Sequence, residues 1–136
     1  MKSNWKLLVI LFFFTLNGCA VKNIGSNLKY DIQGEYYLQQ KAFDDGTTTF
    51  GKLLAKDPGN SRLQYYYGRF LLAEGSPQKA LIHLKKSATM APKKSDYHFW
   101  LGVAYGATGD ANRERLSYEQ SLKYDPNNAL ANIYRG

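Results

Sequence analysis

Two residue types in this chain recur with one spacing, and that spacing restricts the possible folds more than any other feature. Pro58, Pro92 and Pro126 stand 34 residues apart. Glycine keeps the same spacing at Gly34, Gly68, Gly102 and Gly136. Such agreement is hard to obtain by chance, and a period of 34 residues is typical of stacked helix pairs. The tetrapeptide DPGN at 57–60, which returns as DPNN at 125–128, then marks the end of a repeated unit.

Capping residues and prolines predict where the helices of each unit begin and end. Ser76 followed by Pro77 is typical of a helix start, with the serine as N-cap and the proline in the first turn. Asp110, Ser95 and Ser61 are expected to cap three other helices. Each closing proline prevents the helix before it from continuing. We therefore expect first helices at 27–41, 61–74 and 95–108, second helices at 43–56, 77–91 and 111–125, and a seventh helix from about Asn128.

The stretch HFWLGVAYGATGD, which begins at His98, resembles the tetratricopeptide repeat family, whose pattern is W-x2-L-G-x2-Y, then A-x3-F, then P. Leu101, Gly102 and Tyr105 match this pattern. His98 takes the tryptophan place, and Pro126 closes the unit. The resemblance implies an all-α fold, a right-handed α-solenoid of three helix–turn–helix units at about 27–60, 61–94 and 95–128 with the start of a fourth at 129–136.

Two departures from the family pattern concern packing. The place of the small residue that lets paired helices approach is held by Gly46, Ala80 and Glu114 in the three units. Because Glu114 is large and charged, it puts the packing of the third unit in doubt. Gly46 and Gly51 are poor helix formers, since glycine in a helix costs about 1 kcal/mol relative to alanine. The threonines of the run Thr47–Thr49 are also weak helix formers. We expect the second helix of the first unit to be the least stable.

The start of the chain has the pattern of an export signal. Lys2 and Lys6 precede an apolar run, Leu7–Leu16 (LLVILFFFTL). This run is too short to cross a bilayer, which takes about 20 residues, and it fits the core of a secretory signal peptide. The run ends in LNGC, which resembles the lipobox of bacterial lipoproteins. The resemblance implies that residues 1–18 are cleaved.

Cys19 is the only cysteine of the chain, so no disulfide within it is possible. By the same resemblance it carries lipid (palmitate among the acyl chains), and residues 19–26 form a short tether to the repeat domain at 27–136. The tether residues after the cysteine span at most about 25 Å. Ala20 follows the cysteine instead of aspartate, which by resemblance to enterobacterial sorting favours the outer membrane over the inner, facing the periplasm. The alternative is an ordinary signal peptide with an incidental cysteine nearby.

The sequence contains no pattern typical of catalysis or cofactor binding. His83 and His98 are the only histidines, and no Cys/His cluster has the spacing of a metal site. Asp44 and Asp45 stand at a helix start, where acidic side chains favour the helix dipole. From Cys19 onward the chain keeps 16 of its 18 Lys and Arg against 11 Asp and Glu, a formal charge of +5 that is scattered over the sequence. We expect no enzyme, cofactor, metal, small-molecule substrate or nucleic acid.

The resemblance implies binding through a concave face that the first helix of each unit lines. The groove places are Leu28, Asp31, Glu35 and Leu38, then Arg62, Tyr65, Arg69 and Leu72, then Asp96, Phe99, Val103 and Gly106. Tyr65 and Arg69 share one helix face and are residue types enriched at binding hot spots. We expect them to form part of a partner site, or alternatively a partly exposed stacking face, with Tyr67 in the core. Some family members hold carboxylates with basic and Asn residues where Asp31 and Glu35 stand here, so that activity is not expected.

These features together predict a membrane-anchored, non-catalytic adaptor or assembly factor in the bacterial envelope that binds a protein or peptide. Two alternatives stay open. In the first alternative, which the open face at 111–136 suggests, the domain is a structural segment of a larger envelope complex. Otherwise the chain is a fragment of a longer protein with a further domain, because the fourth unit stops at Gly136.

Overall fold

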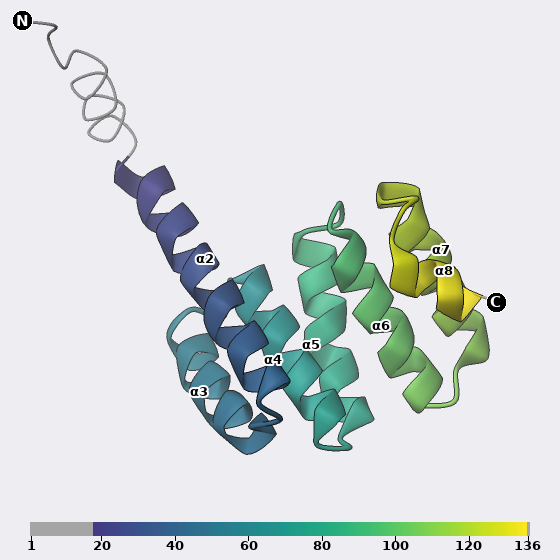
Figure 1. Cartoon of the computed structure of the whole chain (residues 1–136), viewed down its shortest axis with the longest axis horizontal. Coiled ribbons are helices and arrows are strands. Elements are labelled where there is room, and N and C mark those ends of the chain that lie inside the picture. Colours follow the sequence, from purple (N-terminus) through teal and green to yellow (C-terminus); the bar gives the residue numbers. More distant parts are fainter. Residues whose placement is uncertain (1–17, 136) are drawn as a thin grey trace, which may run out of the picture.

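The fold is a single row of helices, seen in a computed structural model that describes residues 18–135, with side chains from residue 25 onward. Helices follow one another along the row, so the start of α2 and the end of α8 lie at opposite ends (Figure 1). No strand occurs between residues 18 and 135, and the predicted all-α fold is confirmed. The helices are α2 (Gly18–Gln39), α3 (Phe43–Lys56), α4 (Ser61–Ala73), α5 (Pro77–Met90), α6 (Ser95–Ala107), α7 (Ala111–Tyr124) and α8 (Ala129–Arg135).

The predicted boundaries of α3 to α8 agree with the structure to within one residue, whereas α2 begins at Gly18 instead of residue 27. The segment 19–26, which we expected to be a tether, is therefore part of a helix, and no proline interrupts it. At about 1.5 Å per residue, seven helical residues span about 10 Å instead of 25 Å. Residues 1–17 lie outside the described residues, as does the side chain of Cys19. Among the helices described, α2 included, none is both long and apolar enough to cross a membrane.

Asparagine, not serine, caps two of the first helices. The side-chain oxygen of Asn60 accepts hydrogen bonds from the backbone N–H groups of Arg62 and Leu63 at 3.1 and 3.3 Å, so the prediction for Ser61 was wrong. Asn128 does the same for α8, accepting from the backbone N–H of Ala131 at 3.0 Å. The repeated tetrapeptides DPGN and DPNN therefore end in helix caps. Asparagine competes well for this place because its short side chain reaches the free N–H groups of the first turn.

The other predicted caps give a mixed result. Asp110 accepts from the backbone N–H of Arg113 at 3.0 Å and is confirmed. Ser76 stands at the N-cap place of α5 without a side-chain cap bond. The prediction for Ser95 was wrong, because Lys94 precedes α6. The Ser95 hydroxyl instead donates to the backbone carbonyl of Ser121 at 3.0 Å, which ties α6 to the end of α7.

Glu114 is accommodated in the third unit, because the residue that faces it on α6, Gly106, is small. A Cβ at Gly106 would lie 2.6 Å from the Glu114 carboxylate. The absence of a side chain at Gly106 on α6 therefore makes room for the large side chain of Glu114 on α7. Thirty-four residues earlier the same two places hold Leu72 and Ala80. In the second unit the large residue is on the first helix and the small one on the second helix, and in the third unit this order is reversed. The carboxylate also accepts a hydrogen bond from the Tyr118 hydroxyl at 3.1 Å.

Gly46 has a packing role that its poor helix propensity conceals. The backbone of α3 at this residue lies directly against the ring of Phe70, and a Cβ would overlap that ring. Phe70 is fully buried and also contacts Phe50, with ring centroids 5.3 Å apart. The low stability of α3 stays a prediction, but this glycine is required by the core.

We predict that Gly46→Ala destabilises the domain, although alanine is the better helix former by about 1 kcal/mol. Overpacking of the Phe70 ring should cost about 1–3 kcal/mol. Gly25→Ala is the matched control, because Gly25 lies in α2 with no atom within 4 Å of its would-be Cβ. Urea unfolding followed by circular dichroism measures both. A Gly46→Ala protein as stable as the wild type would contradict the close approach.

Candidate binding surface

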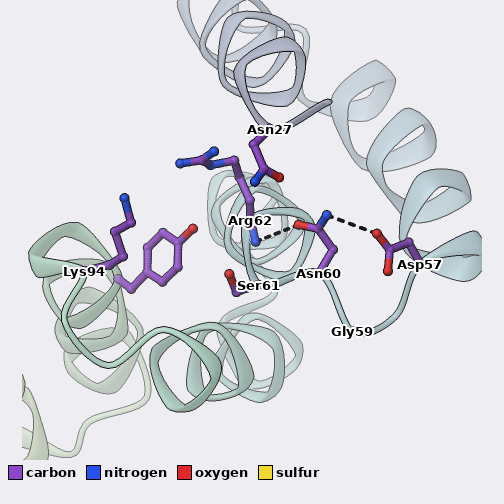
Figure 2. Close-up of a pocket in the computed structure, with 8 residues that line it drawn as sticks. Asn27, Asp57, Gly59, Asn60, Ser61, Arg62 and Lys94 are labelled. Atoms are coloured by element: carbon purple, nitrogen blue, oxygen red, sulfur yellow. Dashed lines mark hydrogen bonds between the residues drawn. The ribbon is translucent and has the colours of Figure 1, made fainter. Parts of the chain in front are cut away.

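Two adjoining hollows lie between α2, α4 and α6, and together we call them the α2–α4–α6 groove. Of the predicted groove places, five line these hollows: Asp31, Glu35, Arg62, Tyr65 and Asp96. One hollow, of about 280 Å³, is lined by Asp31, Glu35 and Asp96 among others. The other, of about 450 Å³, lies where the turns between units meet the helix starts. Figure 2 shows Arg62 reaching over this second hollow between Asn27 and Lys94. The groove is therefore built by all three first helices, as expected.

Two ion pairs join α2 to α4 within the groove. Arg62 pairs with Asp31 at 2.9 Å, and Arg69 pairs with Glu35 at 2.5 Å. The Tyr66 hydroxyl donates a further hydrogen bond to Glu35 at 3.1 Å. Each acid lies one unit before its arginine, so the charges predicted to meet a partner neutralise each other between neighbouring units.

Arg69 is enclosed by aromatic rings. Its guanidinium carbon lies 4.5 Å from the centroid of the Trp100 ring, 5.2 Å from that of Tyr65 and 5.7 Å from that of Tyr66. Only 12% of its side chain is exposed. Such cation–π contacts strengthen when the cation is desolvated. Arg69 therefore connects three first helices, since Glu35 lies on α2 and Trp100 on α6.

Tyr65 is buried, with 6% of its surface exposed. Its ring stacks on that of Tyr97 from α6 at a centroid distance of 4.6 Å, and its hydroxyl accepts a hydrogen bond from Arg69 at 3.1 Å. Burial raises the pKa of Tyr65 well above its usual value. The hydroxyl therefore stays protonated at all physiological pH values. Tyr65 does stack on another ring, but it is not partly exposed as the alternative expectation had it. Its part in a partner site stays a prediction.

The three consecutive tyrosines divide differently from the prediction. Tyr65 and Tyr66 are buried, and the ring of Tyr66 covers Gly34 on α2. Tyr67, which we expected in the core, is only partly buried, and its ring contacts that of His83 edge-on at 4.7 Å. Tyr67 still packs against the main core, as expected. Tyr65 and Tyr66 are buried more deeply, because α2 and α6 cover the two flanks of α4.

The remaining predicted residues differ in how much surface they offer. Phe99 is only 3% exposed, packed between Tyr118 and Tyr134, and Val103 packs partly against the same cluster. Leu72 is half-buried against the main core. Leu28 is well exposed, while Leu38 and Gly106 are partly buried. Partner binding by these residues stays a prediction, and Phe99 and Tyr65 have little surface left for it.

Several residues that line the groove were not predicted from the sequence. Lys94 lines both hollows, is exposed and forms no ion pair in the described part of the chain. Tyr97 lines both as well, and Asn27 lines the larger. Near them Asn128 donates to Asp96 at 3.2 Å. The position of Lys94 could have been predicted from the sequence, because this residue ends the turn between two units and directly precedes α6.

Both histidines make contacts with neighbouring residues of the fold. His83 shares a hydrogen bond of 2.7 Å with Gln64, and its pKa is lowered by burial and then by Lys86. His98 is within 2.7 Å of the Pro92 carbonyl, and its ring stacks on Tyr124. In residues 18–135 no group of three or more His, Cys, Asp or Glu side chains is placed to hold a metal ion.

We predict that Arg69→Ala lowers the free energy of unfolding by roughly 2–4 kcal/mol, because it leaves Glu35 without its cation and empties the space between the rings. Arg115→Ala is the control: Arg115 pairs with Glu119 at 2.6 Å on the exposed surface of α7, where such pairs contribute under about 1 kcal/mol. Equal effects of the two changes in chemical unfolding would show that Arg69 has no special structural role.

Comparison with solved structures shows the same fold. The first tetratricopeptide repeat domain of Spaghetti (RPAP3), bound to the HSP90 peptide SRMEEVD, superposes with a TM-score of 0.72 at 19% identity over 80% of this chain and 86% of that one. The type III secretion chaperone SycD of Yersinia enterocolitica, in complex with a peptide of the translocator YopD, gives 0.66 at 16% identity over 83% and 84%.

Sequence comparison reaches the same family. Residues 37–98 match the profile of the tetratricopeptide repeat. The TPR repeat-containing protein PA0015 of Pseudomonas aeruginosa is 35% identical over 71 residues, which are 52% of this chain and 68% of that protein. With its paired helices and 34-residue period, the chain belongs to the tetratricopeptide repeat family.

Proposed function

We propose that this protein is a membrane-anchored, non-catalytic adaptor or assembly factor of the bacterial envelope, which holds an extended segment of a partner protein in the α2–α4–α6 groove. The observation that carries the proposal is the groove itself. Three first helices line it, and the contacts of Arg69 fix their relative positions before any partner arrives. A preformed site does not lose binding free energy to ordering its own side chains.

The fold neighbours support a peptide as ligand. Both solved structures described above are complexes with peptides, and they share with this chain the stacked helix pairs that create the concave face. Their sequences are too distant to carry residue roles. The chemistry of the bound segment must therefore come from the groove residues of this chain.

The charges that remain free decide which segment fits. Arg62 and Arg69 are paired with acids of α2. Among residues 18–135, Lys94 lines both hollows and forms no ion pair, and Asp96 and Asp125, which line the smaller hollow, form none either. Asn27 and the start of α4 offer polar groups beside Lys94. We propose that a partner segment places an acidic group next to Lys94 and runs along the groove past Tyr97.

The anchoring part of the proposal depends on the sequence alone. The LNGC pattern around Cys19 supports lipid attachment, and Ala20 after it supports an outer-membrane position facing the periplasm. In the structure α2 runs from Gly18 into the repeat domain without a break. A lipid at Cys19 would then be joined to the groove by a helix, which fixes their separation more tightly than a flexible tether.

A structural role in a larger complex is the alternative, and the apolar end of the row favours it. Leu130, Ile133 and Tyr134 are exposed on the short helix α8. Apolar residues gathered at the end of a stack are suited to contact another subunit. Concentration-dependent self-association of the intact chain, with no ligand in the groove, would favour this alternative over the adaptor.

We predict that Lys94→Glu weakens partner capture roughly tenfold or more, because it places like charges together in the groove. Lys93→Glu is the matched control: it makes the same change in net charge one residue away, at an exposed residue that lines neither hollow. Crosslinking in the native cells, followed by quantification of the captured protein, provides the measurement. Equal capture by the two variants would remove the groove as the binding site.

We predict that Cys19→Ser abolishes lipid labelling and releases the protein from salt-washed membranes, because the chain has no other cysteine to carry the acyl chains that give stable anchoring, and high salt screens any contact made by surface charges. Radiolabelled fatty acid incorporation and fractionation test this separately from the groove. Incorporation of label by the Cys19→Ser protein would show that the lipobox interpretation is wrong.

A further inference from the structure

The outward side of α5 differs from the rest of the surface in its charge. Between Glu74 and Asp96 the sequence contains no acidic residue. The same segment carries five lysines: Lys79, Lys85, Lys86, Lys93 and Lys94. All five are exposed. His83 adds no charge at neutral pH, because burial lowers its pKa. Three of these lysines, Lys79, Lys85 and Lys86, lie on α5 itself, which carries no acidic residue, whereas Lys94 lines the groove.

These lysines are not neutralised within the protein. Among the described residues the ion pairs join α2 to α4 or lie around α7, and none includes a lysine of α5. The matching sides of the neighbouring units differ. One unit earlier, α3 carries Asp45 where α5 carries Lys79. One unit later, on α7, Arg113 pairs with Asp110 at 3.0 Å.

Apolar side chains are exposed among these lysines. Ile82 is 56% exposed and Met90 45%. They line a shallow hollow of about 480 Å³ whose other walls are Leu81, Lys85, Lys86 and Thr89. The opposite side of the helix carries the buried residues that face the core. We call the exposed set, Lys79, Ile82, Lys85, Lys86, Thr89 and Met90, the α5 face.

We propose that the α5 face contacts the surface of a bilayer that contains anionic phospholipid. Lysines attract the phosphate groups of such a surface, each contributing to the affinity while it stays within a Debye length. Apolar side chains between the lysines can enter the boundary between headgroups and acyl chains, as in helices that lie flat on membranes. The α5 face supplies both parts on one side of one helix.

The choice of a bilayer over an acidic protein follows from the arrangement of the face. Lys85 and Lys86 line the shallow hollow together with Ile82 and Met90 on a single helix, and no acidic or aromatic residue lines it that would give a protein partner a fixed orientation. The inference rests on the proposed anchoring in one respect, because a lipid at Cys19 would keep the domain beside a bilayer. Contact by the α5 face itself does not require that lipid.

A fluorescent reporter on the face tests the proposal. Because Cys19 is the only cysteine, Cys19→Ser with Ile82→Cys gives one labelling position for an environment-sensitive dye such as NBD. The full-length chain is synthesised cell-free with vesicles of phosphatidylcholine alone or mixed equally with phosphatidylglycerol. We expect a blue shift of the dye with the anionic vesicles only. Thr48→Cys is the matched control, since Thr48 is exposed at the same place on α3, 34 residues earlier, and its label should not shift.

Removal of two charges gives the quantitative test. Lys85→Gln with Lys86→Gln should raise the lipid concentration for half-maximal signal at residue 82 roughly 20-fold. Lys52→Gln with Lys56→Gln on α3 removes the same net charge, and it should change this lipid concentration by less than about threefold. An equal shift with both vesicle types, an equal shift at residues 48 and 82, or capture of an acidic protein without any lipid signal would overturn the proposal. Failure of lipid labelling at Cys19 would leave these results unaffected.

Discussion

The absence of a side chain at one place in each unit is the constraint on which this structure depends. A Cβ at Gly68 would lie 2.6 Å from the side chain of Leu84, and one at Gly102 would lie 2.6 Å from Tyr118. At Gly34 the ring of Tyr66 from the next unit fills the same space. Only glycine allows this approach, so the 34-residue period is a steric requirement. Units with the same internal spacing stack in one register, and that register aligns α2, α4 and α6 around a groove.

Polar contacts complete what the glycines permit. Arg69 pairs with Glu35 on α2 and lies against Trp100 on α6, so one buried guanidinium joins three units. The same contacts reduce the charge of the groove, because the acids of α2 neutralise the arginines of α4. Residue types typical of binding hot spots have here become part of the scaffold. The recognition that we propose for the groove therefore involves groups outside these contacts, above all Lys94 and the polar atoms beside it.

The repeat period was enough to predict the fold class and most helix ends from the sequence, because both follow from local geometry. Burial within α4 was not predictable in the same way. Tyr67 follows the core pattern of its own helix, yet Tyr65 and Tyr66 are buried more deeply, because neighbouring units cover them. The exchange of size between Gly106 and Glu114 likewise involves two helices at once. Single-helix patterns contain no information about such contacts. The binding role of the groove residues predicted from those patterns therefore stays a prediction, and two of these residues, Tyr65 and Phe99, are buried.

A stack held together at periodic positions leaves the outer side of each second helix free to differ. The residues that face outward on α3, α5 and α7 occupy equivalent places but share no charge pattern. Lysines could therefore accumulate on α5 without disturbing the glycine contacts of any unit. The groove lies between α2, α4 and α6, and none of the residues that line it belongs to the α5 face. The bilayer contact that we propose for the α5 face would therefore leave free the residues that we propose for partner binding in the groove.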